Sequence, residues 1–210
     1  MRILAVDTSS ERGSVCIADG GVILGEIRLA SSVQQAERLF RGIEFLFDYM
    51  SFKLADIDIF AASRGPGSFT GLRIGLAAME GFAAAHRKPS AGISTLEALA
   101  WKTGIQNELI APTIDARRGE VYGALYRRVD GRLIEERPPA VLPPLDWFES
   151  LSGEVVHFCG DGAARYGREV HDMDLYLAGT IAQLADTPNR GPLEPLYVRR
   201  TDAEIALEST

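Results

Sequence analysis

A glycine-rich run, Arg64–Gly71, lies where a phosphate-binding loop would lie. The apolar segment Ile57–Ala62 before it predicts a short strand, and Leu72–His86 after it predicts a helix. A strand, loop and helix in this order would point backbone N–H groups and the positive end of the helix dipole at an anion. The candidate anion contacts in the run are Arg64, Gly65, Gly67, Ser68, Thr70 and Gly71.

The spacing within this run departs from the established phosphate loops. A Walker A loop needs a lysine, which the run lacks, and a GxGxxG fingerprint needs glycine where this chain has Thr70. The alternative is a tight turn in which Thr70 caps the following helix. Ser68 follows Gly67 directly, so the run is not the GxSxG pattern of a catalytic serine either.

Metal and general-base chemistry have little support in the sequence. The three histidines are far apart, and no HExxH, HxxxH or CxxC pattern occurs. His86 ends a predicted helix, where a cation is favoured by the dipole. Cys16 and Cys159 lie in apolar stretches and are predicted to be buried thiols in a reducing compartment. We predict no catalytic residue and no metal ligand.

Asp7 and Asp115 each end a predicted strand, and in principle they could meet across a cleft. Each begins a polar turn that carries Arg-Gly and leads into a new strand, so residues 6–15 and 114–121 echo each other. Many hairpins share this pattern, and neither turn has the Asp-x-Gly that lets a phosphate approach the backbone. The echo indicates two related α/β lobes, the second shortened, with residues 1–103 in the first and 104–210 in the second.

Several further elements must position these residues. Three strands with short turns predict an N-terminal antiparallel meander over Arg2–Thr8, Ser14–Ala18 and Val22–Leu29. A wide apolar stripe predicts a helix over Ser32–Tyr49. The other predictions are helices over Thr95–Lys102, Trp147–Leu151 and Asp174–Ala185, strands over Leu109–Ile114, Val121–Arg128, Arg132–Arg137, Glu154–Cys159 and Pro195–Arg199, and an irregular stretch from Pro138 to Pro144.

The composition is that of an ordinary globular chain. The net charge of −7 and the pI of about 5.1 disfavour independent nucleic-acid binding, which depends on phosphate contacts. A local basic patch from Arg117, Arg118, Arg127 and Arg128 is the exception that the sequence allows. No apolar run reaches the roughly 18 residues of a membrane span. The first residues reach Asp7 too soon for a signal peptide, so a cytoplasmic location is expected.

Five segments occur in the order typical of one family. They are residues 6–9, 64–75, 115–122, 160–162 and 195–199, with the sequences VDTS, RGPGSFTGLRIG, DARRGEVY, GDG and PLYVR. On these motifs the chain resembles the TsaB (YeaZ) family, bacterial partner proteins in the synthesis of threonylcarbamoyladenosine on tRNA. The resemblance covers nearly the whole chain, and the glycine-rich run is its most specific part.

This resemblance implies an α/β, actin- and Hsp70-like ASKHA fold of two lobes with a reduced second lobe. It implies a non-catalytic partner that binds and activates TsaD, which transfers threonylcarbamoyl to adenosine next to the anticodon of tRNAs reading A-starting codons. The ATPase TsaE joins the assembly, tRNA is contacted only indirectly, and ATP and metal belong to the partner proteins. The alternative is an ASKHA-type ATP-binding enzyme or a glycoprotease-like peptidase.

The resemblance also places the partner interface on two helices of the first lobe, here Ser32–Tyr49 and Leu72–His86. TsaD carries a metal-binding histidine pair in its first long helix, whereas the stretch around Gln35 has no histidine. Without TsaD, the same surface is expected to form a homodimer. The side chains expected at this surface are Leu39, Phe40, Ile43, Leu72, Gly75, Leu76 and Met79.

Overall fold

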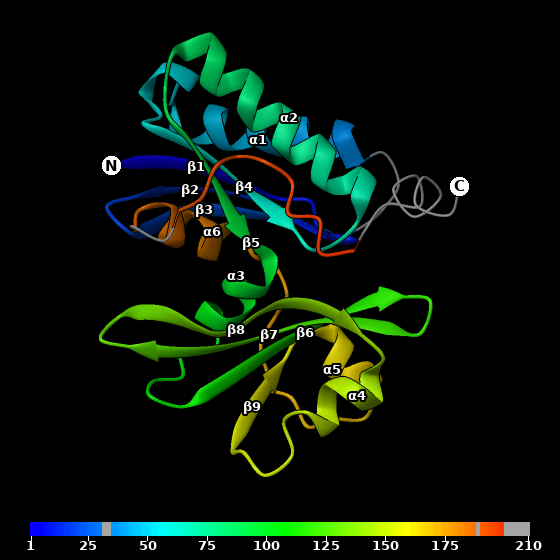
Figure 1. The fold of residues 1–210 in the computed structure, drawn as a ribbon. Helices are drawn as coiled ribbons and strands as arrows, with labels where there is room; N and C mark the ends of the chain where they lie inside the picture. The colour runs from blue at the N-terminus through cyan, green and yellow to red at the C-terminus, as the bar shows by residue number, and fades with distance from the viewer. Residues whose placement is uncertain (31–34, 188–189, 200–210) are drawn as a thin grey trace.

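The computed structural model describes residues 1–30, 35–187 and 190–199 and contains two β-sheets (Figure 1). The first sheet consists of β1 (Arg2–Asp7), β2 (Arg12–Asp19), β3 (Val22–Ala30), β4 (Ile59–Gly65) and β5 (Ser90–Ser94), in the order β3-β2-β1-β4-β5. The first three strands pair antiparallel, which confirms the predicted meander. Strand β4 lies parallel to β1, and β5 lies parallel to β4.

The second sheet repeats most of this pattern. It consists of β6 (Leu109–Arg117), β7 (Glu120–Val129), β8 (Arg132–Leu142) and β9 (Val156–Cys159), in the order β8-β7-β6-β9. Strands β6, β7 and β8 form an antiparallel meander, and β9 lies parallel to β6 as β4 does to β1. The echo between the two strand-end aspartates therefore reflects a shared strand order.

The helices differ between the lobes more than the strands do. In the first lobe α1 (Gln35–Met50) and the short η1 (Leu54–Asp56) precede β4, and α2 (Phe69–His86) follows it. At the equivalent places in the second lobe lie α4 (Pro144–Glu149), before β9, and α5 (Asp161–Arg165), after it. Helices α3 (Thr95–Lys102) and α6 (Ala178–Ala185) lie between the two sheets. The second lobe is thus a reduced version of the first.

The first sheet buries both of its faces, because successive side chains of a strand point to opposite sides. One face carries Leu4, Val6 and Phe60 and is covered by α1 and α2. Both helices lie on the side of this sheet away from the second lobe (Figure 1). The predicted start of the first helix, residues 32–34, lies outside the described residues.

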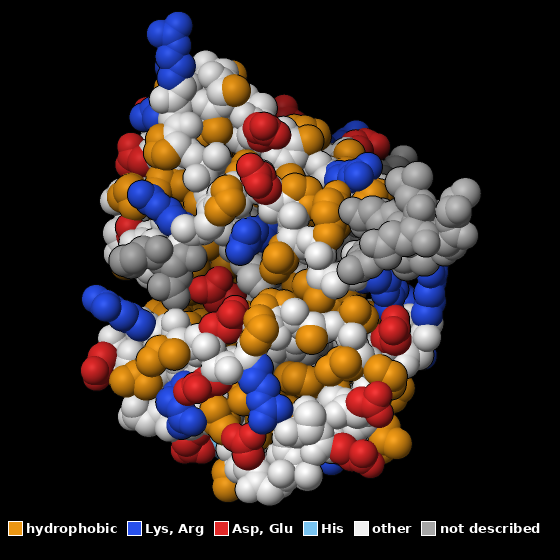
Figure 2. Space-filling view, viewed as in Figure 1, with side chains coloured by type: hydrophobic (Ala, Val, Ile, Leu, Met, Phe, Trp, Pro, Cys, Tyr) orange, Lys and Arg blue, Asp and Glu red, His pale blue; other side chains and the backbone are white. Residues whose placement is uncertain are grey.

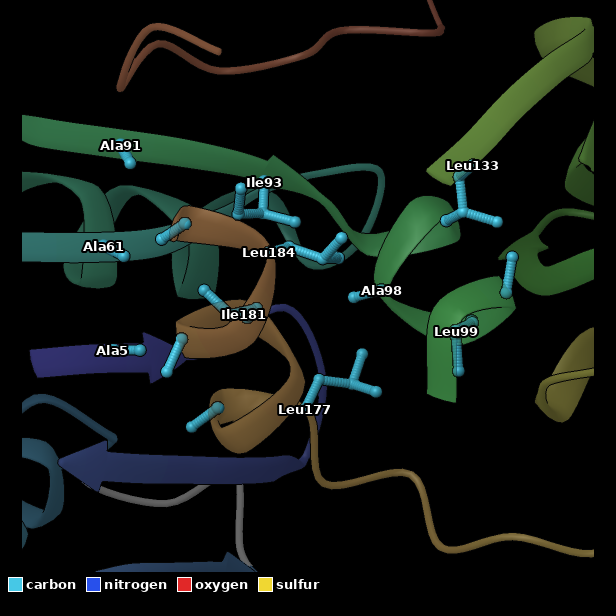
Figure 3. Close-up of a cluster of buried hydrophobic side chains, with 14 of the residues drawn as sticks. Ala5, Ala61, Ala91, Ile93, Ala98, Leu99, Leu133, Leu177, Ile181 and Leu184 are labelled. Atoms are coloured by element: carbon cyan, nitrogen blue, oxygen red, sulfur yellow. The ribbon is translucent and has the colours of Figure 1, made fainter. Parts of the chain in front are cut away.

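The opposite face of the first sheet is covered by α6 and α3 (Figure 3). Ala5, Ala61 and Ile93 lie against α6, whose Ile181 is fully buried. The same cluster continues into the second lobe through residues such as Leu133 of β8. One hydrophobic core therefore joins the two lobes.

Helix α6 also corrects the predicted division of the chain. The Ala178 N–H donates to Ser14 Oγ at 2.9 Å, and Gly191 pairs with Gly92 of β5. Because α6 and the segment after it pack on the first sheet, the assignment of all of residues 104–210 to the second lobe is wrong in its last part.

Several other boundaries differ from the sequence predictions. Strand β8 continues through Pro138 and Pro139 to Leu142, where an irregular stretch was expected. The two prolines are tolerated because β8 is an edge strand whose pairing with β7 shifts register there. The last helix begins at Ala178 rather than Asp174, and Pro195–Arg199 is not a strand. Strand β5 and helix α5 were not predicted.

None of the helices in the described ranges is long and apolar enough to cross a membrane.

Candidate functional site: the interlobe cleft and the outer face of α1 and α2

The glycines of the Arg64–Gly71 run are explained by contact with the turn between β1 and β2. A Cβ on Gly67 would lie 2.5 Å from the Ser9 carbonyl oxygen. On Gly71 it would fall well inside van der Waals contact with the Thr8 carbonyl oxygen, and on Gly75 with the Thr8 hydroxyl. These three glycines let the start of α2 pack directly on the end of β1.

Two backbone N–H groups of the run are bonded within the chain. The Ser68 N–H donates to the Ser9 carbonyl oxygen at 2.7 Å, and the Gly71 N–H donates to Ser68 Oγ at 3.3 Å. Ser68 is therefore the N-cap of α2, and the expectation that Thr70 caps this helix is wrong. The run packs as a tight turn on the β1–β2 turn, and anion binding by its residues stays a prediction.

Arg64 packs against the segment that follows α6. Its guanidinium lies beneath Gly191, where an added Cβ would be 3.2 Å from Arg64 Cζ. Its carbonyl oxygen accepts a hydrogen bond from the Leu196 N–H at 2.7 Å. Gly65, at φ +113°, is in a conformation that favours glycine. Neither residue lines the cleft described next.

A cleft of about 690 Å³ lies between the lobes. The first lobe contributes the β1–β2 turn and the first residues of α2, and the second lobe contributes the β6–β7 turn and Asp161 of α5. Asp161 Oδ1 accepts the Asp115 N–H at 3.2 Å, and Asp115 Oδ1 accepts the Arg117 N–H at 2.9 Å. The Asp115 carboxylate also lies 3.5 Å from Arg165 Nε, so its charge is balanced by arginine.

Asp7 is buried and does not line this cleft. Its Oδ1 accepts the Ser9 N–H at 3.0 Å, the same local contact that Asp115 makes with Arg117. Burial raises the pKa of the Asp7 carboxyl, and the hydrogen bonds from Ser9 and Ser63 oppose this only in part. The two strand-end aspartates therefore do not form a facing pair across the cleft.

The four arginines expected to form one basic patch lie at opposite ends of β7. Arg117 and Arg118 occupy the β6–β7 turn, and Arg127 and Arg128 lie ten residues on, about 30 Å along the strand. Arg127 pairs with Glu136, and Arg128 stacks 3.7 Å over the Trp101 ring. The prediction of a single patch is wrong, and acidic and basic side chains are interspersed over the face in Figure 2.

The predicted partner-contact residues are mostly internal. Leu39 and Ile43 of α1 and Leu72, Gly75, Leu76 and Met79 of α2 are buried against the first sheet. Only Phe40, 47% exposed, lies on the surface. The choice of the other six side chains as an exposed surface is therefore wrong, because they lie on the sides of α1 and α2 that pack against the first sheet.

The outer face of α2 carries small residues instead. At helical spacing it presents Thr70, Ile74, Ala77, Ala78, Gly81, Ala84 and Ala85, which are exposed or half-buried. Phe40 of α1 adjoins this face through a T-shaped contact with Phe82 at 6.2 Å. We call these eight residues (Phe40 and the seven of α2) the outer face. The repeated alanines and Gly81 are visible in the sequence, but alanine and glycine occur on both sides of α2, and Arg73 and Glu80 are the charged residues that mark its exposed side.

The two cysteines are free and buried, as predicted. Burial raises the pKa of the Cys16 thiol to about 12 and also raises that of Cys159, so both remain protonated at neutral pH. In the described residues, no three His, Cys, Asp or Glu side chains come together as a metal-binding group.

Two lobes of one strand order, joined by a shared core and separated by a cleft, define the two-lobe ASKHA fold. The model of the family described as "TsaD: tRNA N6-adenosine threonylcarbamoyltransferase" matches residues 29–187. The Escherichia coli "tRNA threonylcarbamoyladenosine biosynthesis protein TsaB" is 36% identical over 74% of this chain and 70% of that protein. The Bacillus subtilis protein of the same name is 29% identical over 90% of this chain and 84% of that protein.

A solved structure, "YeaZ from Pseudomonas aeruginosa", superimposes with a TM-score of 0.77 at 27% identity, covering 93% of this chain and 99% of that one. The chain belongs to the TsaB (YeaZ) family.

Proposed function

We propose that this chain acts in tRNA threonylcarbamoyladenosine biosynthesis as a non-catalytic partner that binds and activates a TsaD-type transferase. Relatives in two bacteria carry this pathway in their names. The outer face of α1 and α2 is the observation that carries the partner role. It is apolar and built mainly of small residues, which let a second helix approach closely.

Gly81 supports the proposal that this face contacts a partner. No heavy atom lies within 4 Å of the position that a Cβ would occupy, so the chain's own packing does not require glycine there. A glycine inside a helix costs about 0.5–1 kcal/mol relative to alanine. Close contact with a partner helix would offset that cost. By contrast Gly71 and Gly75, on the inner side, are required by contact with β1.

The non-catalytic part of the proposal rests on how the glycine-rich run is used. The N–H groups of Ser68 and Gly71 are bonded within the chain, and the Asp7 carboxyl is buried beneath its own turn. We therefore assign ATP and metal to the partner proteins and an ATPase of the TsaE type to the assembly. Contact with tRNA is then indirect.

One observation favours the alternative, an ATP-binding enzyme or a peptidase. The interlobe cleft of about 690 Å³ is large enough to hold a small molecule. Titrating the free chain with magnesium–ATP separates the two functions. Saturable binding at one site would favour the enzyme, whereas the partner role predicts none.

Reconstitution tests the proposed function directly. Transfer of threonylcarbamoyl to tRNA would be measured with the TsaD-type transferase, the TsaE-type ATPase and the adenylate-forming enzyme of the same organism, with and without this chain. We expect product only when the chain is present. Equal product in both reactions would overturn the activator role.

The outer face also predicts the state of the chain alone. Apolar patches of this kind are rarely left uncovered. We expect a homodimer that buries the outer face, measured by light scattering at tens of micromolar chain. A monomer at that concentration would contradict the expectation.

A further inference from the structure

The segment after α6 returns along the edge of the first sheet. Gly191 and Gly92 of β5 exchange two backbone hydrogen bonds, of 3.0 and 3.1 Å. A Cβ on Gly92 would overlap the Pro192 carbonyl oxygen, so this contact requires glycine. The segment is thereby fixed to the first lobe before it reaches the cleft.

Leu196 and Tyr197 then bind the glycine-rich run and α2. The Leu196 N–H donates to the Arg64 carbonyl oxygen at 2.7 Å. The Tyr197 ring packs on Phe69 at 5.9 Å, and Arg73 Nη2 donates to the Tyr197 hydroxyl at 3.4 Å. The Arg73 guanidinium also lies 3.8 Å over the Phe69 ring. The first turn of α2 is therefore joined to this segment by an aromatic contact and a hydrogen bond, and the cation–π contact within α2 orients the Phe69 ring.

Two residues further on, Arg199 binds the second lobe. Its Nη1 donates to the Ala116 carbonyl oxygen at 3.1 Å, and its Nη2 forms an ion pair with Glu120. Its guanidinium lies 5.7 Å from the centre of the Tyr122 ring. These contacts join the segment to the β6–β7 hairpin. Within four residues, from Leu196 to Arg199, the chain crosses from one lobe to the other along the cleft.

We propose that residues 195–199 form a latch that fixes the opening of the interlobe cleft and holds the first turn of α2 against the β6–β7 hairpin. The shared core behind α6 joins the lobes on one side of the cleft, and the latch joins them on the other. This is a property of the free chain, so it goes beyond the proposed function and does not depend on it.

The two ends of the latch differ in strength. The Leu196 hydrogen bond and the Tyr197 ring contacts are multiple and partly apolar. The Arg199 side chain is 23% exposed and its partner Glu120 35% exposed, so this ion pair is weakened by salt. The latch therefore opens at Arg199, and it moves with α2 when it opens.

Hydrogen exchange of the full chain tests this proposal. Arg199→Ala removes the contact with the second lobe, and Arg190→Ala, an exposed arginine of the same segment, is the matched control. We expect Arg199→Ala to speed exchange of the amides in residues 65–73 and 114–122 by about five- to tenfold, with α1 and α6 unchanged. High salt should likewise speed exchange of these amides in the native chain.

A charge swap makes the test specific. Glu120→Arg alone should speed exchange in both segments, and Arg199→Glu combined with Glu120→Arg should restore the part of the protection that the ion pair supplies, but not the part from the Ala116 hydrogen bond. Exchange in Arg199→Ala that matches the Arg190→Ala control would overturn the latch. So would a uniform rise across the whole chain, because that would show a loss of overall stability rather than the release of one contact.

Discussion

The turns after β1 and β6 have the same construction but different surroundings. In each, a strand-end aspartate accepts the N–H two residues on, at 3.0 Å for Asp7 and 2.9 Å for Asp115. In each, the helix after the parallel strand packs a glycine on this turn: Gly71 contacts Thr8, and Gly162 contacts Asp115. Yet Asp7 is buried, whereas Asp115 lines the cleft among arginines.

The helices show what this difference means. In the first lobe, α1 and α2 have 16 and 18 residues, whereas their counterparts α4 and α5 have 6 and 5. The second lobe keeps only enough helix to cover its sheet. The first lobe keeps two long helices, and one of them has a small-residue face that its own core does not use. The strand order is shared by both lobes, and the partner function that we propose rests on the two long helices that only the first lobe has.

The largest expected effect comes from the glycines that support the two turns. We expect Gly71→Ala and Gly162→Ala each to lower the free energy of unfolding by about 3 kcal/mol or more, because backbone atoms lie where the new Cβ would go. Urea denaturation measures both. If Gly162→Ala left the free energy of unfolding unchanged while Gly71→Ala unfolded the chain, the two turns would not be equivalent.

Asp7 and Asp115 should respond differently to neutralisation. Because burial raises the folded-state pKa of Asp7 above its ordinary value of 3.8, the folded chain retains a proton that the unfolded chain has lost. Stability contributed by this group is full below pH 3.8 and is lost as the pH rises through the folded-state pKa. We expect Asp7→Asn to have a free energy of unfolding about 1 kcal/mol higher than that of the native chain at pH 8, and the difference to be smaller at pH 4.

Asp115→Asn is the comparison for that experiment. It removes a partly exposed charge from arginine neighbours and should lower the free energy of unfolding by about 1 kcal/mol or less. Thermal unfolding of both variants across the pH range measures the contrast. An Asp7→Asn variant with the same pH dependence as the native chain would contradict the account of Asp7.

Gly81→Ala separates stability from partner binding. No atom lies near the new methyl group, so we expect the free energy of unfolding to rise by about 0.5–1 kcal/mol. Affinity for the TsaD-type subunit should fall at the same time, because the methyl group pushes the partner helix away. Denaturation and a binding titration on one preparation give both values. A variant that is more stable and binds as tightly as the native chain would remove Gly81 from the interface.

The smallest expected effect is at Asp174, which lies before α6. The Asp174 carboxylate forms ion pairs with Lys102 and Arg28. Burial raises the pKa of this carboxyl, but the two cations and the Tyr176 N–H lower it by more, so the pKa lies below its ordinary value of 3.8. Its stabilisation is present above pH 3.8 and is lost as the pH falls through the folded-state pKa. Because Asp174 is 39% exposed, we expect Asp174→Asn to cost about 0.5 kcal/mol in low salt and nothing measurable in high salt. A larger loss of unfolding free energy that persists in high salt would contradict this prediction, because it would show that the Asp174 ion pairs are shielded from solvent.

Local sequence patterns were sufficient to predict most of the strands and helices. The meander and α3 followed from hydrophobic alternation and turn residues, and the resemblance in the glycine-rich run led to the two-lobe fold. Strand β8 ran past Pro138 because an edge strand tolerates proline where its register shifts, which depends on a neighbour that the sequence does not reveal.

The site itself could be predicted only in part. The two helices of the proposed interface were found, but small residues lie on both sides of α2: Gly71, Gly75 and Ala83 face inward, whereas Ala77, Gly81 and Ala84 face outward. Arg64 and the Pro195–Arg199 segment were noted as motifs, yet their contact with each other joins residues more than 130 positions apart. Such contacts follow from the assembled fold and not from local sequence.

A binding titration tests the central claim most directly. The TsaD-type subunit would be titrated into the native chain and into two variants that carry the same substitution: Ala77→Arg on the outer face and Ala164→Arg at an exposed position of α5 in the second lobe. Our account predicts that Ala77→Arg weakens binding about 100-fold or more and that Ala164→Arg binds as the native chain does. Equal affinity of Ala77→Arg and the native chain would contradict it.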